Sequence, residues 1–344
     1  MPIVMPMRRS TATTSVTGMR PSPDNGWAFA TYRNYVAGYT RFLEQFDQDA
    51  ARFPAIRSAV TGSARNRMAP LDKIKPRVEI VRAFRNAWAT EITMALPRVS
   101  DMGDDRFVAA ALHWLGPQAY YAVFQGGLGT IAAKGAPLPE THHTFLSSIH
   151  SQFTEQNMLP APWNGTCDKG WTTGGHVYGG CLAQSKPAPN SSYPGTLDDA
   201  AGAICTALKT TRDRRFDDVK EELIEKKRIK TKAGKPAKRM PMDRQRVEYQ
   251  EMTCTTMFDF LYRLRIRSHY RDADTFLSPN IGDVTTYYDD LLALTRSTLH
   301  ALESLAVLAV GEAWFRDQLV TFSNRRLPAF AKQHSVLGRW QELI

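Results

Sequence analysis

The sequence has 344 residues, of which 43% are hydrophobic and 23% are charged. These proportions are near the average for globular proteins, and they exclude a wholly disordered chain, a collagen-like chain and a small disulfide scaffold. The length allows one large or two ordinary domains, and 44 Lys and Arg against 34 Asp and Glu give a formal net charge of +10.

The cysteines and the apolar segments predict a soluble, cytoplasmic protein. None of the four cysteines forms a CxxC pair, as expected in a reducing compartment. The longest apolar stretch, residues 299–315, is interrupted by His300, Glu303 and Glu312, and we expect it to be too short and too charged to span a bilayer. Residues 1–26 lack the apolar run of a secretory signal and are predicted to form a disordered tail. No membrane partner is predicted.

The first helical patterns follow this tail. Apolar residues at helical spacing predict one amphipathic helix over residues 27–53. A second helix is predicted over residues 76–96, where Pro97 would end it. Residues 27–76 are therefore expected to form a helical N-terminal segment.

A longer pattern covers residues 104–135. We expect a helix to start at Pro117 within it, because proline is favoured in the first turn of a helix. Gly126, Gly127 and Gly129 would let another helix approach closely. A phosphate-binding loop is not predicted there, because no strand precedes the glycines and no Lys-Ser/Thr pair follows them.

The middle of the chain changes in character. Residues 141–143, Thr-His-His, mark the start of another helix, where a neutral imidazole can pack or cap. Residues 158–200 are rich in Gly, Pro, Asn, Ser and Thr, which predicts an irregular segment. Helical patterns return over residues 197–228 and again over residues 244–267.

The last strong pattern is a long helix that opens at Asp283. We expect it to bend near Gly311 and a final helix to end at Pro328. The acidic pair at residues 289–290 is predicted to lie on the solvent face of the long helix. No alternating strand pattern of useful length and no internal repeat is found, so the predicted fold class is all-α.

Most of the positive charge lies in one segment. Residues 209–246 hold 15 Lys and Arg against 7 Asp and Glu, which gives +8 of the total +10. Residues 226–246 hold ten of these basic residues against one acid, and a glycine and two prolines interrupt any helix there. This basic arm can neutralise the phosphates of a nucleic acid, or it can be a solvated surface loop. The predicted RNA-binding residues of the arm are Lys226, Lys227, Arg228, Lys230, Lys232, Lys235, Lys238 and Arg239.

A second basic cluster lies in residues 258–276, FDFLYRLRIRSHYRDADTF. Arginine can clamp a phosphate with two parallel hydrogen bonds, and histidine can transfer a proton near neutral pH. The pattern fits metal-independent RNA cleavage in which Arg263 stabilises the phosphate and His269 is the general acid/base. The supporting RNA-binding residues are Arg265, Arg267 and Arg271.

Two alternatives for these residue patterns stay open. The arginines can instead hold the end of a helix by pairing with aspartates of the same segment, namely Asp259, Asp272 and Asp274. A metal site could use Cys167, His176 and Cys181, but structural zinc takes four ligands, commonly with a closely spaced pair. No metal and no cofactor is predicted.

Three segments resemble the HEPN family (higher eukaryotes and prokaryotes nucleotide-binding). Residues 118–149 are similar to the central helix pair of the family, with an aromatic-rich helix, a loop and a Thr-His step into the next helix. Arg263 and His269, with five residues between them, match the Arg-to-His motif of the family. Residues 272–302 look like the loop and the closing long helix of the same domain.

The resemblance implies a HEPN-like helical bundle formed by residues 77–150 and 251–327. Residues 151–250 would be a Gly-rich and basic insertion, and residues 328–344 a C-terminal tail. Members of the family often dimerise, and many are RNases of toxin-antitoxin, defence and RNA-processing systems. We therefore expect an RNA-binding protein and candidate endoribonuclease whose partners are RNA, a second copy and a cognate regulator or antitoxin. A non-catalytic helical module that binds nucleic acid is the alternative.

Overall fold

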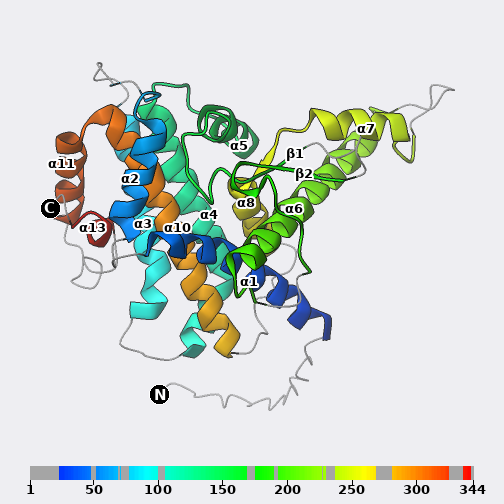
Figure 1. The fold of residues 1–344 in the computed structure, drawn as a ribbon, viewed down its shortest axis with the longest axis horizontal. Helices are drawn as coiled ribbons and strands as arrows, with labels where there is room; N and C mark the ends of the chain where they lie inside the picture. Colours follow the sequence, from blue (N-terminus) through cyan, green and yellow to red (C-terminus); the bar gives the residue numbers. More distant parts are fainter. Residues whose placement is uncertain are drawn as a thin grey trace, which may run out of the picture.

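Helix α10 (Ile281–Val310) lies at the centre of the fold, and helices from both halves of the chain pack against it (Figure 1). The computed structural model describes residues 23–47, 52–68, 70, 77–99, 105–168, 175–189, 193–226, 228–229, 237–268, 281–324 and 336–341. These residues are mostly helical with one small sheet, so the all-α prediction is confirmed except for that sheet. One hydrophobic core contains buried residues from Phe29 in the first helix to Trp340 near the end of the chain.

Five α-helices in the described part of the chain precede the sheet: α1 (Pro23–Leu43), α2 (Arg52–Ala64), α3 (Arg77–Val99), α4 (Asp105–Ala133) and α5 (His142–Ile149). The described residues of the predicted N-terminal segment therefore contain two helices, α1 and α2, where one was expected. The single helix predicted over residues 27–53 is wrong, because α1 ends at Leu43 and a 3₁₀ turn follows at Glu44–Phe46. The ring of Phe46 leaves the helical face and stacks on Trp163, with the ring centroids 6.3 Å apart. Helix α3 also runs two residues beyond Pro97.

Helix α4 is continuous through Pro117, so the predicted helix start at this proline is wrong. Pro117 lacks the N–H group that would bond to the carbonyl of His113. The residues on both sides of it, Leu115 and Ala119, are buried, and α4 packs against α3 and α10. Burial of this long apolar helix outweighs the loss of one hydrogen bond.

The glycines of α4 allow the close helix packing that was predicted. A Cβ atom at Gly126 would lie 2.7 Å from Leu299 Cδ2 of α10, and one at Gly129 would lie 2.8 Å from Phe84 Cε2 of α3. Real Cβ atoms do not approach other atoms so closely. The glycines therefore serve packing, as expected.

The predicted irregular segment contains two strands of a three-stranded antiparallel sheet. The elements of this region are β1 (Thr166–Asp168), β2 (Val177–Gly179), a 3₁₀ turn (Gly180–Leu182), α6 (Leu197–Glu225), α7 (Met242–Glu251), β3 (Thr255–Thr256) and α8 (Met257–Ile266). The strand order is β2-β1-β3, and Cys167 pairs with Tyr178 on one side and Thr255 on the other. Helix α6 lies where it was predicted, whereas the helix expected over residues 244–267 is divided into α7 and α8 by β3.

The C-terminal helices confirm the predicted bend. Helix α10 ends at Val310, Gly311 adopts a φ of 82°, and α11 (Glu312–Ser323) follows. By length and composition alone, Asp283–Val310 could cross a membrane, but most of it is buried inside the fold, as in the core helix of a globular domain. Its relation to a membrane therefore stays a prediction.

The predicted C-terminal tail contains a short buried helix, α13 (Val336–Arg339), so the tail prediction is wrong for these residues. The guanidinium of Arg339 donates to Glu91 of α3 and, at 2.6 Å, to Glu303 of α10. The indole of Trp340 donates to the other oxygen of Glu303 at 2.7 Å. We refer to Arg339, Glu91 and Glu303 as the buried ion network. It attaches the end of the chain to the central helices.

Candidate functional site

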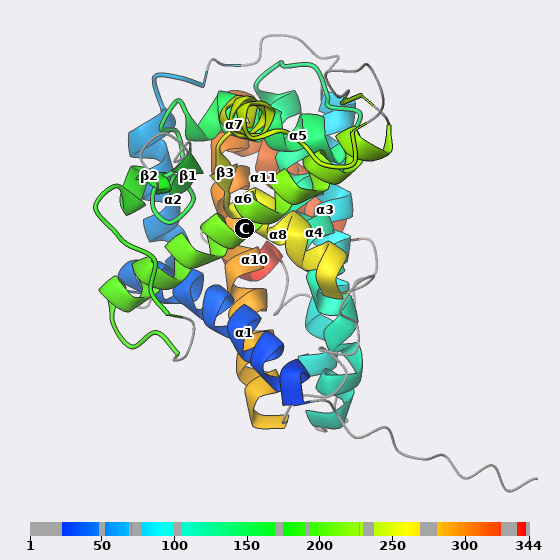
Figure 2. The same ribbon diagram turned by 90° about the vertical axis from the view of Figure 1, so that its right-hand side faces the viewer.

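Helices α6 and α8 lie next to each other on the side of the molecule that faces the viewer in Figure 2. Polar side chains of both helices line a shared pocket. We call it the arginine pocket. Its lining is Thr211, Arg214, Arg215 and Asp218 from α6, and Asp259, Tyr262, Arg263, Ile266 and Arg267 from α8 and the turn after it. On each of the two helices, four of the lining residues are spaced i, i+3, i+4 and i+7. This spacing places them on the same face of their helix. Four arginines against two aspartates give the lining a net charge of +2.

Two of the arginines have carboxylate partners within the pocket. Arg215 Nη1 lies 2.8 Å from Asp259 Oδ1, and Arg214 Nη2 lies 3.3 Å from Asp218 Oδ1. Asp259 is 3% exposed and also caps α8, because its other oxygen accepts from the backbone and the hydroxyl of Thr256 at 2.8 and 2.9 Å. The alternative that the arginines of residues 258–276 pair with Asp259 is therefore wrong, because the partner of Asp259 is an arginine of α6. Asp272 and Asp274 lie outside the described residues.

Arg263 differs from these two arginines. Its Nη1 donates to the hydroxyl of Thr211 at 3.4 Å, and no carboxylate within the described part of the chain pairs with it. Its Nε is buried without a hydrogen-bond partner. Arg263 as a whole is half-buried, and a guanidinium that lacks a full set of acceptors is well suited to an anion that supplies them.

A cluster of aromatic rings adjoins the arginine pocket. The guanidinium of Arg265 lies over the rings of Tyr120, Tyr121 and Tyr262, at 5.7, 5.0 and 5.7 Å from their centroids. We call these four residues the tyrosine cluster. Tyr262 belongs to both groups, since it also lines the arginine pocket. The two groups are therefore continuous.

His142 completes the tyrosine cluster on its α5 side. Helix α5 starts where it was predicted, and a capping box of Thr141 and Thr144 fixes His142 at its first position. The Nδ1 atom of His142 lies 2.9 Å from the hydroxyl oxygen of Tyr120. Burial and the nearby Arg265 and His143 lower the pKa of His142, so its imidazole is neutral at pH 7.

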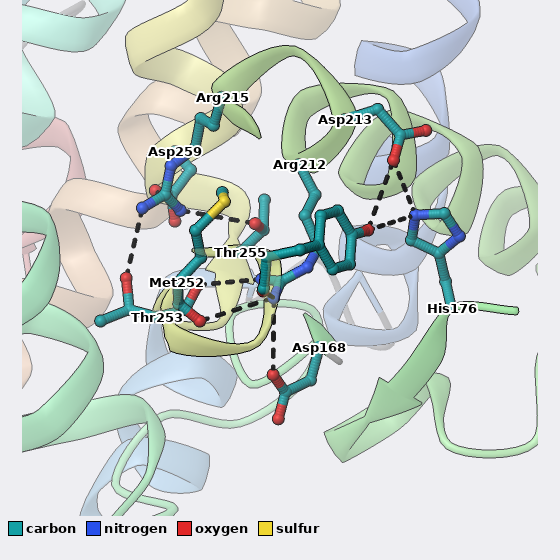
Figure 3. A network of polar contacts seen from close by, with 10 residues as sticks. Asp168, His176, Arg212, Asp213, Arg215, Met252, Thr253, Thr255 and Asp259 are labelled. Carbon is teal, nitrogen blue, oxygen red and sulfur yellow. Dashed lines mark hydrogen bonds and ion pairs between the residues drawn. The ribbon is translucent and has the colours of Figure 1, made fainter. Parts of the chain in front are cut away.

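A network of polar contacts holds the segment that leads into α8 (Figure 3). The buried Arg212 of α6 donates to the carbonyls of Tyr249 and Thr253, each at 3.0 Å, and its guanidinium lies 4.8 Å from the ring centroid of Tyr249. Its Nη2 is 3.9 Å from Asp168 Oδ1 on β1. Arg215 adds a bond of 3.2 Å to the hydroxyl of Thr253. The network fixes where β3 ends and α8 begins, and so positions the α8 side of the arginine pocket.

The metal alternative is not supported by these contacts. His176 Nε2 lies 2.9 Å from Asp213 Oδ1 and 2.8 Å from the Tyr249 hydroxyl, so it is already engaged (Figure 3). Burial raises the pKa of Cys167 to about 12 and that of Cys181 to about 11, which disfavours the thiolate that binds metals. No three His, Cys, Asp or Glu side chains in the described ranges form a group that could hold a metal ion.

The structure describes only part of the predicted basic arm. Lys226 ends α6 and pairs with Glu222, while Arg228, Lys238 and Arg239 are exposed. The last part of the arm is helical, because α7 begins at Met242. The predicted site residues that lie outside the described residues are Lys227, Lys230, Lys232, Lys235, His269 and Arg271.

Arg214 and Arg215 were missed as site residues in the sequence. Their signal was the polar stripe at 211, 214, 215 and 218 in a helix whose earlier turns are apolar. The predicted residues Arg263 and Arg267 do meet in the arginine pocket, whereas Arg265 lies beside it in the tyrosine cluster.

No protein-family model matches the chain, and no curated protein or solved structure matches it either. The HEPN resemblance therefore rests on the residues of this sequence alone.

Proposed function

We propose that the protein binds RNA through the arginine pocket and the adjoining tyrosine cluster. One observation carries this proposal: four arginines from two helices line one pocket that contains only two acidic residues. The arginines are Arg214, Arg215, Arg263 and Arg267. Guanidinium groups recognise phosphate with two parallel hydrogen bonds and stay charged. Tyr121 is the exposed ring of the tyrosine cluster, and an exposed ring beside such a site can stack on a base. The basic residues that follow α6 are proposed to add phosphate contacts of their own.

The finer proposal is metal-independent cleavage of the bound RNA. The ribose 2′-oxygen attacks the adjacent phosphorus, the bond to the 5′-oxygen breaks, and a 2′,3′-cyclic phosphate forms. One proton leaves the 2′-hydroxyl and one joins the departing 5′-oxygen. Arg263 would stabilise the charge on the phosphate and His269 would transfer a proton, as the HEPN resemblance implies. Arg263 supports this proposal because no carboxylate among the described residues neutralises it.

A non-catalytic binding module is the second candidate. The observation that favours it is the pairing of Arg215 with Asp259 and of Arg214 with Asp218, which gives two of the four pocket arginines a role in holding the helices together. Such a module would bind RNA with the same salt dependence but would leave it intact.

The first test of RNA binding is its dependence on salt. We expect the logarithm of the association constant to fall linearly with the logarithm of the salt concentration. Arg263→Gln should remove about one phosphate contact, reducing the slope by about 0.7–0.9 and the affinity by about fivefold to tenfold near 0.1 M salt. Fluorescence anisotropy with labelled RNA, and with DNA of the same sequence, measures both quantities. Arg316→Gln, an exposed arginine of α11 on another side of the fold, is the matched control. Equal affinities for the two variants would contradict the proposal.

Cleavage is tested in EDTA. Incubation of the purified protein with mixed RNA should give fragments with cyclic-phosphate ends, and His269→Ala should slow this reaction by about 100-fold or more. The readout is the chemistry of the cut ends, resolved by gel mobility before and after phosphatase treatment. Salt-sensitive binding without fragments would establish the non-catalytic module. Cleavage that His269→Ala leaves unchanged would remove the catalytic assignment of this residue.

A further inference from the structure

Helix α4 exposes a line of aromatic side chains. Phe107 is 38% exposed, Trp114 is 49% exposed and Tyr121 is 38% exposed. They are seven residues apart, which is about two helical turns, so they lie along one line of the helix with a rise of ~10 Å between neighbours. No charged residue occurs from Phe107 to Ala133. We call these three residues the aromatic stripe.

The aromatic stripe leads into the candidate site. Tyr121, its last member, also belongs to the tyrosine cluster, where the Arg265 guanidinium lies 5.0 Å from its ring. The same guanidinium lies 5.7 Å from the ring of Tyr262, which lines the arginine pocket. Rings and guanidinium groups therefore form a continuous path from the arginine pocket along α4.

We propose that the aromatic stripe binds the unpaired bases of a single-stranded nucleic acid whose phosphates are held by the arginine pocket. This inference rests on the proposed RNA binding and deepens it by naming the class of substrate. The stripe is uncharged and aromatic, and the pocket is cationic, so the complementary ligand has both exposed rings and negative charge. A single strand has both, because its bases are free to stack on aromatic side chains. A duplex presents phosphates but keeps its bases inside.

The positive charge of the neighbouring arginine pocket also disfavours an apolar protein as the partner of the aromatic stripe. A hydrophobic helix laid along the aromatic stripe would bring no anion to the neighbouring Arg263, whose Nε is buried without a hydrogen-bond partner. A strand bound along the same path supplies phosphate oxygens to the arginine pocket. Arg265 can remain over its tyrosine rings in the complex, since a guanidinium plane is itself a stacking surface for a base.

The test compares three labelled ligands of about 12 nucleotides, a length within the usual range for single-strand binding sites. They are a single-stranded RNA, the same RNA as a duplex, and a strand that keeps the sugar-phosphate backbone but lacks bases. We expect the single strand to bind at least about tenfold more tightly than either other ligand. Trp114→Ala and Tyr121→Ala should each weaken binding of the single strand by about tenfold and leave its salt slope unchanged.

Matched variants separate stacking from a general loss of structure. Tyr121→Phe keeps the ring and should bind the single strand more tightly than Tyr121→Ala does. Tyr193→Ala removes a ring that is 46% exposed and lies just before the start of α6, outside the proposed path, and it should leave the affinity unchanged. Circular dichroism and the thermal unfolding midpoint verify that the Trp114→Ala and Tyr121→Ala proteins are folded.

The outcomes distinguish this inference from the proposed function. If RNA binds with a salt slope that Arg263→Gln reduces, but duplex and base-free strand bind equally well, RNA binding stands and the stacking path is overturned. If Trp114→Ala changes the oligomeric state measured by light scattering and not the affinity for RNA, the stripe is an interface between copies and the inference is overturned. If no ligand binds, both proposals are wrong.

Discussion

Replacing Arg339 with Met is expected to lower the free energy of unfolding by about 3–5 kcal/mol. The guanidinium of Arg339 is buried, and its two partners, Glu91 and Glu303, are both fully buried carboxylates. Burial lowers the pKa of Arg339, but the attraction of the two carboxylates outweighs burial and raises it, so this arginine stays charged. Removing it leaves two buried carboxylates, and among the described residues the arginine that still pairs with them is Arg296, whose Nε lies 3.3 Å from Glu91.

Urea unfolding followed by circular dichroism measures this loss. Arg316→Met, an exposed arginine on α11, is the matched control and should change stability by less than about 0.5 kcal/mol. The triple variant Arg339→Met, Glu91→Gln, Glu303→Gln should be more stable than Arg339→Met alone, because it buries fewer unpaired charges. An Arg339→Met protein that unfolds at the wild-type urea concentration would show that α13 does not hold the end of the chain.

The pH dependence gives a second readout for the same network. Burial already raises the pKa of Glu303 above its ordinary value, and Arg339 opposes this effect. Without Arg339 the pKa of Glu303 in the folded protein should rise further above that in the unfolded chain. The folded variant then binds more protons than the unfolded chain as the pH falls from 7 toward the ordinary pKa of glutamate. The stability defect of Arg339→Met should therefore be smaller at about pH 5 than at pH 7.

The helices that were predicted correctly are those in which local signals and packing agree. Helix α6 begins at the capping pair Thr196 and Asp199, and α10 is followed by Gly311, whose positive φ ends the helix. The predicted helix start at Pro117 was wrong because two effects compete there. Proline prefers the first turn of a helix, but burial of the residues before and after Pro117 favours a continuous helix. Local preference yields when tertiary packing contributes more free energy.

The sheet and the C-terminal contact could not be predicted from local patterns. The strands are two or three residues long, too short to show alternation, and β1 pairs with β3 almost 90 residues later. Glu91, Glu303 and Arg339 each look like surface residues in the sequence, because a charged side chain is normally exposed. Only the fold brings them together, where Arg339 pairs with both carboxylates.

The candidate site was predicted in part for a similar reason. The arginines of α8 are close in sequence, so their clustering was visible, and Arg263 and Arg267 do line one pocket. Arg214 and Arg215 lie about 50 residues earlier and become partners of α8 only through the packing of α6 against it. The aromatic rings of α4 gave a helical pattern, but which of them stay exposed depends on the helices that cover α4.

Replacing Arg212 with Met is expected to lower the free energy of unfolding by about 3 kcal/mol or more. Arg212 does not line the arginine pocket, but its guanidinium donates to the carbonyls of Tyr249 and Thr253 and lies over the Tyr249 ring (Figure 3). Met keeps much of the side-chain volume and removes every donor. Three carbonyls, with that of Met252 at 3.5 Å included, and the carboxylate of Asp168 therefore lose this partner. Urea unfolding measures the loss, and hydrogen exchange should show faster opening of residues 242–256 than of α10.

Arg214→Met, two residues along the same helix, is the matched control. It should affect RNA binding and leave stability nearly unchanged, whereas Arg212→Met should mainly affect stability. Arg214 pairs with Asp218 at 3.3 Å in a partly exposed i, i+4 pair, so its removal should cost less than about 1 kcal/mol of stability. It lines the arginine pocket, so its removal should weaken RNA binding and reduce the salt slope. Arg212→Met should lose RNA affinity only to the extent that the start of α8 is displaced, and its salt slope should stay at the wild-type value, because no phosphate contact is removed. If Arg212→Met reduced the slope at unchanged stability, the buried arginine would itself be a phosphate ligand, and the division between the anchoring network and the arginine pocket would be wrong.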